Sequence, residues 1–387
     1  MKKIFIAIFA VVVSAVSCLN LDEVAYSKMT ADNYYKNFSE ADIPAALGTI
    51  YSDLRKLYAG GSAHTSGNWL YTSEEVGDIW ITPKRGGSWY DGGIYFRLNQ
   101  HKWEWDDNHI LNNWRQAYSS INTCNRLMYE FRTAEVKDTV SLMAELKVAR
   151  AFWYYDLCDM YGNVPFVETV SLENPKLMLR ADLYDWLETE LLELVGLLPA
   201  QKISYYRMDK VAAEFMLMRL YLNAQVYTGT PQWDKAAEYA AKVMNSQYEL
   251  NTEVNPNEKD LHGKPFTAYQ RLFMANNDQN GAQKEAIFAV AQDGQLTQCW
   301  GGSVFLVAAP RDAGYNNWGI STSWTCLRAT PELVWKFFPN VPLNYTAVDP
   351  SYAGDEYELP TLAGDDRAIL CNQVKDSTGA VAKVWEF

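Results

Sequence analysis

Two stretches of the sequence combine flat aromatic side chains with polar side chains that can hydrogen-bond a ligand. The first runs from residue 80 to residue 99 and contains Trp80, Lys84, Arg85, Trp89, Tyr90, Asp91, Tyr95 and Asn99. The second runs from residue 298 to residue 324 and contains Trp300, Arg311, Asp312, Tyr315, Asn316, Asn317, Trp318 and Trp324. A sugar ring has an apolar C–H face and a rim of hydroxyls, which aromatic platforms and nearby amide, carboxylate or guanidinium groups bind together. Both stretches therefore predict glycan recognition.

Ten residues of these stretches form the candidate glycan-binding set: Trp80, Arg85, Trp89, Tyr90, Asp91, Trp300, Tyr315, Asn316, Trp318 and Trp324. The alternative is that their rings pack the interior, because tryptophan is well buried on average in folded proteins. For tryptophans inside or beside predicted helices that alternative is the stronger one. We therefore expect core positions for Trp103, Trp105, Trp114, Trp153, Trp186 and Trp233.

Glu104, Asp106 and Asp107 lie beside aromatic residues, which raises the alternative of a glycoside hydrolase. Such an enzyme needs two carboxyl groups that face the scissile bond at a defined separation. Neighbouring positions in one short segment do not establish that geometry, and capping of the following helix explains the two aspartates more simply. The four histidines form no metal-binding pair, and no G-x-S-x-G, Walker A or dinucleotide motif is present. We predict a binding protein without catalytic residues, metal or cofactor.

Charge and cysteine content narrow the choice of partner further. The chain has 387 residues and a formal net charge of −13, so its surface repels nucleic-acid phosphates and we expect no nucleic-acid partner. Apart from Cys18, five scattered cysteines contain no C-x-x-C pair, which argues against a disulfide framework and a zinc site. Cys124 and Cys158 lie in helical patterns, where we expect them to be small buried apolar residues.

The N-terminus has the features of an export signal. Two lysines precede the apolar run from Ile4 to Val13, and small residues follow up to Cys18, which predicts a signal peptide over residues 1–17. Cleavage directly before Cys18 is the lipoprotein arrangement, in which acyl chains on that residue anchor the protein through a tether over residues 18–25. Ala15 stands where leucine is commoner, so an ordinary cleaved signal with an incidental cysteine is the alternative.

Helical periodicity dominates the chain up to about residue 250. Apolar residues at helical spacing predict helices that end near Tyr58, over 109–131, over 142–161, after Asp182, from Asp209 to Gly229 and over 233–244. The helix over 142–161 is apolar around most of its circumference, so it should be central. Helices 109–131 with 142–161, and 208–227 with 233–246, have the lengths of tetratricopeptide-type antiparallel pairs.

Beyond residue 250 this periodicity fades, and only the segment from Pro331 to Phe338 again predicts a helix. The predicted fold is therefore mainly α, with a tetratricopeptide-like helical scaffold over about residues 26–250 and an irregular, loop-rich second lobe over about 251–387. We treat residues 26–387 as one binding domain.

Several short motifs follow one another along the chain. Cys18 is followed closely by Leu21-Asp22, and a W-x-x-x-Y-x-x-I-x-x-x-N pattern runs from Trp114 to Asn125. The next predicted helix ends in a Y-G-x-V-P turn at Tyr161 to Pro165. Further motifs follow in order: Arg180, Lys210, Arg219-Leu220-Tyr221-Leu222, Trp233 with Ala236-Ala237, an N-E-x-I-F-like strand at Lys284 to Phe288, Thr330-Pro331-Glu332-Leu333, and Asp366-Arg367 in a D-x-R-like segment. In this order the motifs resemble those of the SusD/RagB-like outer-membrane nutrient-binding lipoproteins, with the Y-G-x-V-P turn as the most diagnostic match and Cys18 at the mature N-terminus.

The resemblance implies a helical scaffold, a ligand face built from loops, no catalytic activity and a SusC-like TonB-dependent transporter as partner. It also implies an outer-membrane lipoprotein that faces the cell exterior. The expected function is capture of oligosaccharides and their delivery to that transporter, with peptide capture as the alternative because some members take peptides. Family members usually extend well past the D-x-R segment, so we expect a truncated C-terminus in this chain, which ends at Phe387.

Overall fold

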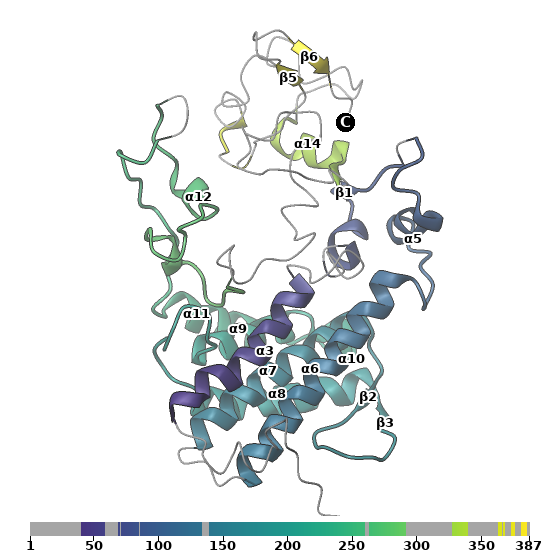
Figure 1. Ribbon diagram of the computed structural model, residues 1–387, viewed down its shortest axis with the longest axis vertical. Coiled ribbons are helices and arrows are strands. Elements are labelled where there is room, and N and C mark those ends of the chain that lie inside the picture. Colours follow the sequence, from purple (N-terminus) through teal and green to yellow (C-terminus); the bar gives the residue numbers. More distant parts are fainter. Residues whose placement is uncertain are drawn as a thin grey trace, which may run out of the picture.

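The long helices between residues 43 and 244 pack side by side into one body, and loop-rich segments with shorter helices lie above it (Figure 1). The computed structural model describes residues 40–58, 69, 71–84, 86–133, 139–259, 263–291, 327–339, 363–365, 367, 373–375 and 381–384. The helical body contains α3 (Ile43–Tyr58), α6 (Asn108–Thr133), α7 (Thr139–Met160), α8 (Arg180–Leu197), α9 (Lys210–Leu222), α10 (Ala224–Thr228) and α11 (Trp233–Met244).

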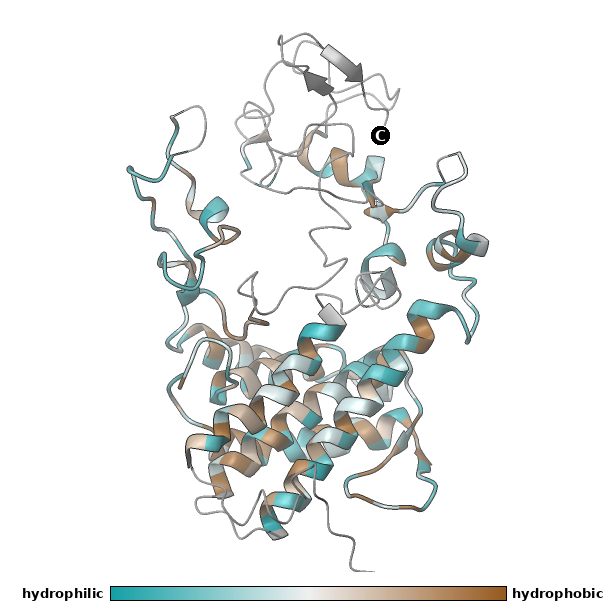
Figure 2. Ribbon diagram, in the orientation of Figure 1, coloured by the Kyte–Doolittle hydropathy of each residue, from teal (hydrophilic) through white to brown (hydrophobic). Residues whose placement is uncertain are grey.

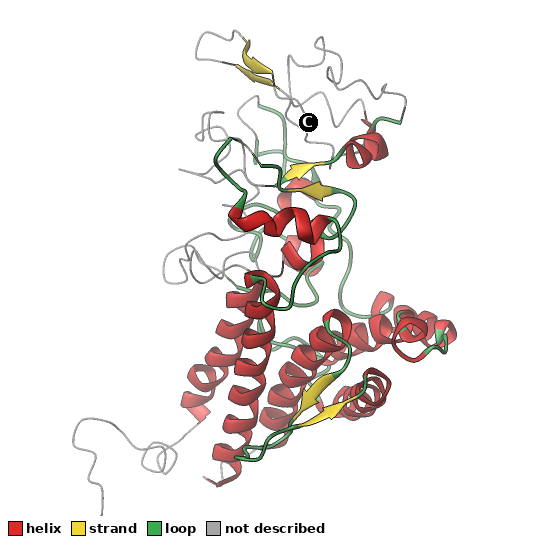
Figure 3. Ribbon diagram, turned by 90° about the vertical axis from the view of Figure 1, so that its right-hand side faces the viewer, coloured by secondary structure: helices red, strands yellow, loops and turns green. Residues whose placement is uncertain are grey.

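Short elements make up the remainder of the described chain. The helical ones are η1 (Glu40–Asp42), the π-helical turn η2 (Tyr71–Glu75), η3 (Asp91–Gly93), α5 (Ile94–Asn99), α12 (Ala268–Arg271), η4 (Ala282–Lys284) and α14 (Pro331–Phe337). The strands form three two-stranded antiparallel sheets: β1 (Trp80–Ile81) with β4 (Arg328–Ala329), β2 (Val164–Phe166) with β3 (Lys176–Met178), and β5 (Gln373–Lys375) with β6 (Val381–Val384). Figure 3 shows the β2–β3 hairpin against the helical body, away from the loops that carry β1.

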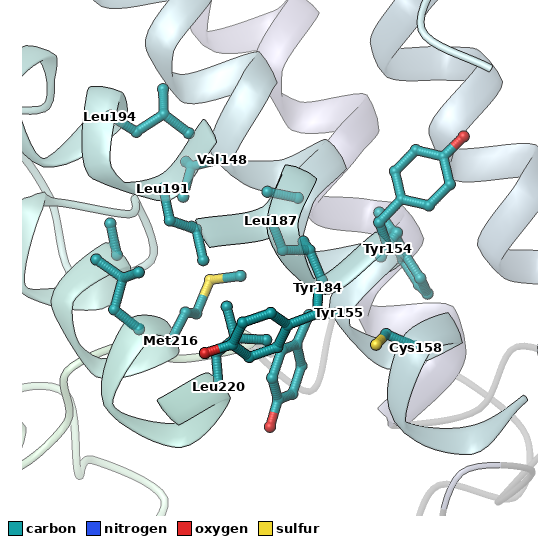
Figure 4. Close-up of a cluster of buried hydrophobic side chains, with 14 of the residues drawn as sticks. Val148, Tyr154, Tyr155, Cys158, Tyr184, Leu187, Leu191, Leu194, Met216 and Leu220 are labelled. Carbon is teal, nitrogen blue, oxygen red and sulfur yellow. The ribbon is translucent and has the colours of Figure 1, made fainter. Parts of the chain in front are cut away.

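Helix α7 is the centre of the body, as its sequence predicts. It packs against α3, α6, α8 and α9. Trp153 and Leu157 on one face and Tyr154 beside them have no exposed surface, which places more than one face of this helix in the core. Figure 4 shows α7 side chains meeting leucines of α8 and residues of α9 such as Met216. Apolar residues concentrate in this body, whereas the region around α12 is largely hydrophilic (Figure 2).

The two expected helix pairs, α6 with α7 and α9 with α11, are present. Asp209 caps α9 as predicted, because its carboxylate accepts a hydrogen bond from the backbone N–H of Ala212 at 3.0 Å. The prediction that Asp182 caps α8 is wrong, since that helix already starts at Arg180 with Leu179 at the N-cap position. The mainly α, tetratricopeptide-like fold class is confirmed.

The Y-G-x-V-P turn, which follows α7, packs against α6. Gly162 follows α7 with φ +80°, a left-handed conformation that glycine adopts without strain. The rings of Trp114 and Tyr161 lie 5.1 Å apart edge to face, and the Tyr118 hydroxyl donates to the carbonyl of Pro165 at 2.5 Å. These contacts explain why aromatic residues occur at positions 114 and 118 of α6 and at position 161, directly after α7.

A buried arginine on α7, Arg150, also connects α6, α8 and the loop after β2. The guanidinium of Arg150 on α7 donates to Asn125 of α6 at 3.0 Å and to Glu190 of α8 at 2.9 Å. It also donates to the backbone carbonyl of Glu168, in the loop after β2, at 3.0 Å. Because Arg150 is only 4% exposed, removing any acceptor would leave a buried charge less well satisfied.

Two further predictions about packing are wrong. Trp233 is 58% exposed, because α11 turns Ala236 and Tyr239 toward α9 and leaves the tryptophan at the outer edge. The segment 285–288 is not a strand: it follows η4 as a turn and an irregular stretch without a strand partner among the described residues.

The cysteine prediction is confirmed for the two helical positions. Cys124 and Cys158 are free, fully buried thiols within the core. Burial raises the pKa of Cys124 to about 12 and that of Cys158 to about 11, so both thiols stay protonated and unreactive. In the part of the chain that the structure describes, no helix is long and apolar enough to span a bilayer.

Candidate functional site

The first aromatic stretch rests on a small core of its own, above the helical body. This core contains Tyr71 from η2, Ile94, Tyr95 and Leu98 from the start and end of α5, and Leu327, which precedes β4. Trp80 and Trp89 are half-buried and pack against this core. The stretch is therefore an ordered surface with its own support.

A buried carboxylate fastens η2 to β1. Glu75 and Thr82 are both fully buried, and the two carboxylate oxygens of Glu75 accept from the Thr82 backbone N–H at 2.7 Å and from its hydroxyl at 2.8 Å. Burial raises the pKa of Glu75 to about 7, although the hydrogen bonds from Thr82 lower it. The sequence reasoning missed this residue, because nothing in the local pattern marks it as buried.

The sheet β1–β4 joins this stretch to a distant part of the chain. Trp80 pairs with Ala329, and Ile81 pairs with Arg328. Thr330 continues the connection, since its N–H donates to the Ile79 carbonyl at 3.0 Å and its hydroxyl to the Asp78 carbonyl at 2.6 Å. Residues 327–330 begin three positions after Trp324, the last residue of the second aromatic stretch, so the fold brings the flank of that stretch to the first one.

The turn at Trp89 to Gly93 has a strained backbone. Trp89 has φ +63° and Asp91 has φ +39°, conformations that residues other than glycine rarely adopt. The ring of Trp89 meets that of Tyr95 edge to face at 5.9 Å, which helps to hold the turn. Strain of this kind persists where the surrounding structure enforces it, and it is common at binding sites.

Tyr90 and Asp91 are the most accessible members of the candidate set among the described residues. Tyr90 is 49% exposed, and the Lys84 ammonium lies 4.9 Å from the centre of its ring. Asp91 is also exposed. This juxtaposition presents a flat ring together with a cation and a carboxylate that can bind hydroxyl groups.

The other predicted site residues lie outside the described residues. They are Arg85 of the first stretch, and Trp300, Tyr315, Asn316, Trp318 and Trp324 of the second. The lipidation position Cys18 is also outside them. The joint participation of both stretches in one site therefore stays a prediction.

Two tryptophans that the sequence analysis assigned to the core are exposed instead. Trp105 is 79% exposed and Trp103 is 45% exposed. They lie in the irregular segment and turn that precede α6. Trp114, on α6, and Trp186, on α8, are partly buried against the main core, as predicted. The D-D-N helix-start signal at residues 106–108 could have revealed this turn.

An ion pair fastens the turn with the two tryptophans to α5. The Arg97 guanidinium forms a two-point ion pair with Asp107 and donates to the Gly92 carbonyl at 2.7 Å. Asp107 also accepts from the Glu104 backbone N–H at 2.9 Å. This ion pair links the segments that carry the exposed rings of Tyr90, Trp103 and Trp105, and we call these three rings the aromatic surface.

Hydrogen bonds keep the carboxylate of Asp107 ionised. Burial alone would raise the pKa of Asp107, but hydrogen bonds from Arg97 and from the Glu104 N–H hold it below its usual value. A carboxyl group that stays ionised cannot act as a general acid. Glu75 is the nearby acid with a raised pKa, and Thr82 occupies both of its oxygens. In the described part of the chain, no group of three or more His, Cys, Asp or Glu side chains could hold a metal ion.

A helical solenoid that supports exposed aromatic loops defines a class of binding protein. The sequence model of a family described as starch-binding and associating with the outer membrane matches residues 22–222, more than half of the chain. The chain belongs to this SusD-like family.

Individual relatives agree with that assignment. The starch-binding protein SusD of Bacteroides thetaiotaomicron is 34% identical over 258 residues, which cover 61% of this chain and 44% of that protein. A SusD-like carbohydrate-binding protein of Bacteroides fragilis has a similar structure, with a TM-score of 0.59 at 19% identity over 84% of this chain and 58% of the other. A structure containing a xylogluco-oligosaccharide also gives a TM-score of 0.59 at 18% identity, over 76% of this chain and 55% of the other. The chain thus spans less than two thirds of the length of each of these relatives.

Proposed function

We propose that this chain is a cell-surface glycan-binding lipoprotein that captures oligosaccharides and passes them to a SusC-like TonB-dependent transporter in the outer membrane. The observation that carries the glycan assignment is the aromatic surface, in which Trp105, Tyr90 and Trp103 are 79%, 49% and 45% exposed. Three exposed rings on linked segments favour a binding role, whereas a single exposed ring such as that of Trp233 is common on protein surfaces. The family membership and the starch-binding relative support the same ligand class.

The polar residues around the rings suit a sugar. Lys84, Asp91, Lys102 and Glu104 are exposed beside the rings and offer both donors and acceptors to hydroxyl groups. An extended peptide would instead need a row of unpaired backbone groups to bind its main chain. The polar side chains beside the rings therefore favour a sugar over a peptide as the ligand. We also prefer binding to hydrolysis as the function.

The remaining parts of the proposal concern the address of the protein. We propose a signal peptide over residues 1–17, a lipidated tether over 18–25 and a binding domain over 26–387, with the lipid attached to Cys18. Replacing Cys18 by alanine should move the protein from the membrane fraction to the soluble fraction. Unchanged partitioning would contradict the lipid anchor and leave the glycan proposal untouched.

Calorimetric titration of the soluble protein against maltoheptaose, a xyloglucan oligosaccharide and a mixed oligopeptide tests the ligand class. We expect heat of binding with at least one sugar and none with the peptide. Binding of peptide alone would favour the peptide receptor, and release of reducing ends during the titration would favour the hydrolase.

Alanine variants test the aromatic surface. Trp105→Ala and Tyr90→Ala should each weaken glycan binding by about 1 kcal/mol or more, because each removes a stacking platform. Trp89→Ala should weaken it similarly, with some loss of stability because Trp89 packs on the small core. Trp233→Ala is the matched control, since it removes an exposed tryptophan from α11 and should bind like the wild type. Normal affinity in both Trp105→Ala and Tyr90→Ala would refute the site assignment.

A further inference from the structure

His101 lies beside an exposed tryptophan of the aromatic surface. It follows α5 and precedes Trp103 in the same short segment. The centres of the two rings lie 5.6 Å apart, with 53° between their planes, and both residues are exposed. A histidine is thus paired with a flat ring at a surface where a sugar would stack.

The backbone position of His101 is one that usually belongs to glycine. Its φ is +55°, and it directly follows Gln100, the C-cap residue of α5. The His101 N–H donates to the Leu98 carbonyl at 3.1 Å, and the Lys102 N–H donates to the Arg97 carbonyl at 2.7 Å. These two bonds form the Schellman motif, in which glycine is the preferred residue at the left-handed position. Since the backbone favours glycine here, the reason for a histidine is to be sought in its side chain.

One nitrogen of the imidazole is fixed by a distant segment. Nε2 of His101 lies 2.8 Å from the backbone carbonyl of Val76, which follows η2 and packs against the small core. A carbonyl oxygen can only accept a hydrogen bond, so Nε2 carries the hydrogen. In the neutral ring the other nitrogen, Nδ1, then has a lone pair and acts as an acceptor. Among the described residues, Nδ1 has no hydrogen-bond partner.

The surroundings of this acceptor set its position before any ligand binds. Val76 is supported by the small core, and the ion pair between Arg97 and Asp107 fastens the segment that carries Trp103. A ligand at the Trp103 ring therefore meets an imidazole whose orientation is already determined. Ordering of that side chain then costs the complex little affinity.

We propose that His101 is a glycan-binding residue: a sugar ring packs on Trp103 while one of its hydroxyls donates a hydrogen bond to Nδ1 of His101. This inference rests on the proposed glycan function of the aromatic surface. A sugar suits the pairing because it has hydroxyl donors on the rim of an apolar ring, so one sugar unit can satisfy both side chains. A unit whose hydroxyl points elsewhere forgoes this bond and binds less tightly, so His101 contributes to the choice of sugar.

Calorimetric titration of variants with maltoheptaose and the xyloglucan oligosaccharide tests the proposal. His101→Gly removes the imidazole and suits the left-handed backbone, so affinity should fall about fivefold to tenfold while the urea midpoint stays close to that of wild type. His101→Asn should recover part of the lost affinity, because asparagine also tolerates this backbone and carries an acceptor oxygen near the position of Nδ1. Asn245→Gly is the matched control, since it puts glycine at the exposed C-terminal end of α11 and should bind like wild type.

A double variant tests whether both groups bind the same sugar unit. Without the tryptophan ring the unit is less well placed for His101. Trp103→Ala combined with His101→Gly should therefore lose less affinity than the product of the two single losses.

The outcomes separate this inference from the glycan function itself. A wild-type protein that binds neither sugar overturns both. If wild type binds sugar, unchanged affinity in His101→Gly or an equal loss in Asn245→Gly overturns the role of His101 alone. No recovery in His101→Asn, or a double variant that shows the full product of both losses, overturns the pairing of Trp103 with Nδ1 on one sugar unit.

Discussion

Replacing Glu75 by glutamine tests how the aromatic surface is supported. Glu75 is fully buried, and both of its oxygens are bonded to Thr82, which begins the loop after β1. Glutamine has nearly the same shape but carries no charge and does not titrate. The substitution therefore separates the ionisation of this side chain from its packing.

The magnitude follows from the raised pKa of Glu75. Below pH 4.5 the carboxyl is protonated in both the folded and the unfolded chain, so burial carries no ionisation cost. Between pH 4.5 and about 7 the unfolded chain ionises while the folded chain keeps its proton, so wild-type stability falls as the pH rises. Each pKa unit corresponds to about 1.4 kcal/mol, which gives a loss of about 3 kcal/mol by pH 8. Glu75→Gln lacks this loss, so its free energy of unfolding relative to wild type should rise by that amount between pH 4.5 and pH 8.

Urea unfolding followed by tryptophan fluorescence at pH 4.5, 6 and 8 measures this difference. Glu238→Gln serves as the control, because Glu238 is an exposed α11 residue paired with Lys242 and its stability difference should vary little with pH. A difference in unfolding free energy between Glu75→Gln and wild type that is the same at all pH values reflects altered hydrogen bonds to Thr82 and does not bear on the ionisation. If Glu75→Gln and wild type give parallel stability curves, the reasoning about the buried carboxylate is wrong.

Three further substitutions probe the helical body. Asp156→Asn should raise the free energy of unfolding relative to wild type by about 2–4 kcal/mol more at pH 8 than at pH 4, because burial raises the pKa of Asp156 from 3.8 to about 7. A pH-independent difference in urea unfolding would contradict this. Leu187→Ala should cost about 2–5 kcal/mol, since this α8 residue is fully buried, and a loss below about 1 kcal/mol in the same assay would refute its core position. Gly162→Ala should lower the free energy of unfolding by about 1 kcal/mol, because alanine is strained in the left-handed backbone at φ +80°. The new methyl group adds no clash, since it meets Arg180 at normal contact distance. An unchanged melting temperature would contradict the strain.

The helical part of the fold could be predicted from sequence because its signals are local. The spacing of Leu47, Ile50 and Leu54 predicts α3, and all three are buried. Asp209 occupies the N-cap of α9, and the glycine of the Y-G-x-V-P pattern ends the turn after α7, as expected. Such features depend on residues within one or two turns of each other, so no knowledge of distant contacts is needed.

The candidate site could be predicted only in part. Tyr90 and Asp91 are exposed as a binding role requires, but Trp80 and Trp89 are half-buried and contribute to the small core. Trp103 and Trp105 were assigned to the core and are exposed. Composition alone does not distinguish these cases, since a tryptophan beside a helix can face either way.

The sequence by itself therefore determined the helices of the body, the cap of α9 and the aromatic character of the loops. Only the tertiary structure decided which rings reach the surface, that Glu75 is buried against Thr82, and that Trp80 pairs with Ala329 about 250 residues later. Periodicity reports which face of a helix is apolar, and this information is contained in neighbouring residues. Exposure in a loop depends on what packs against it, and here that packing comes from segments far away in the chain.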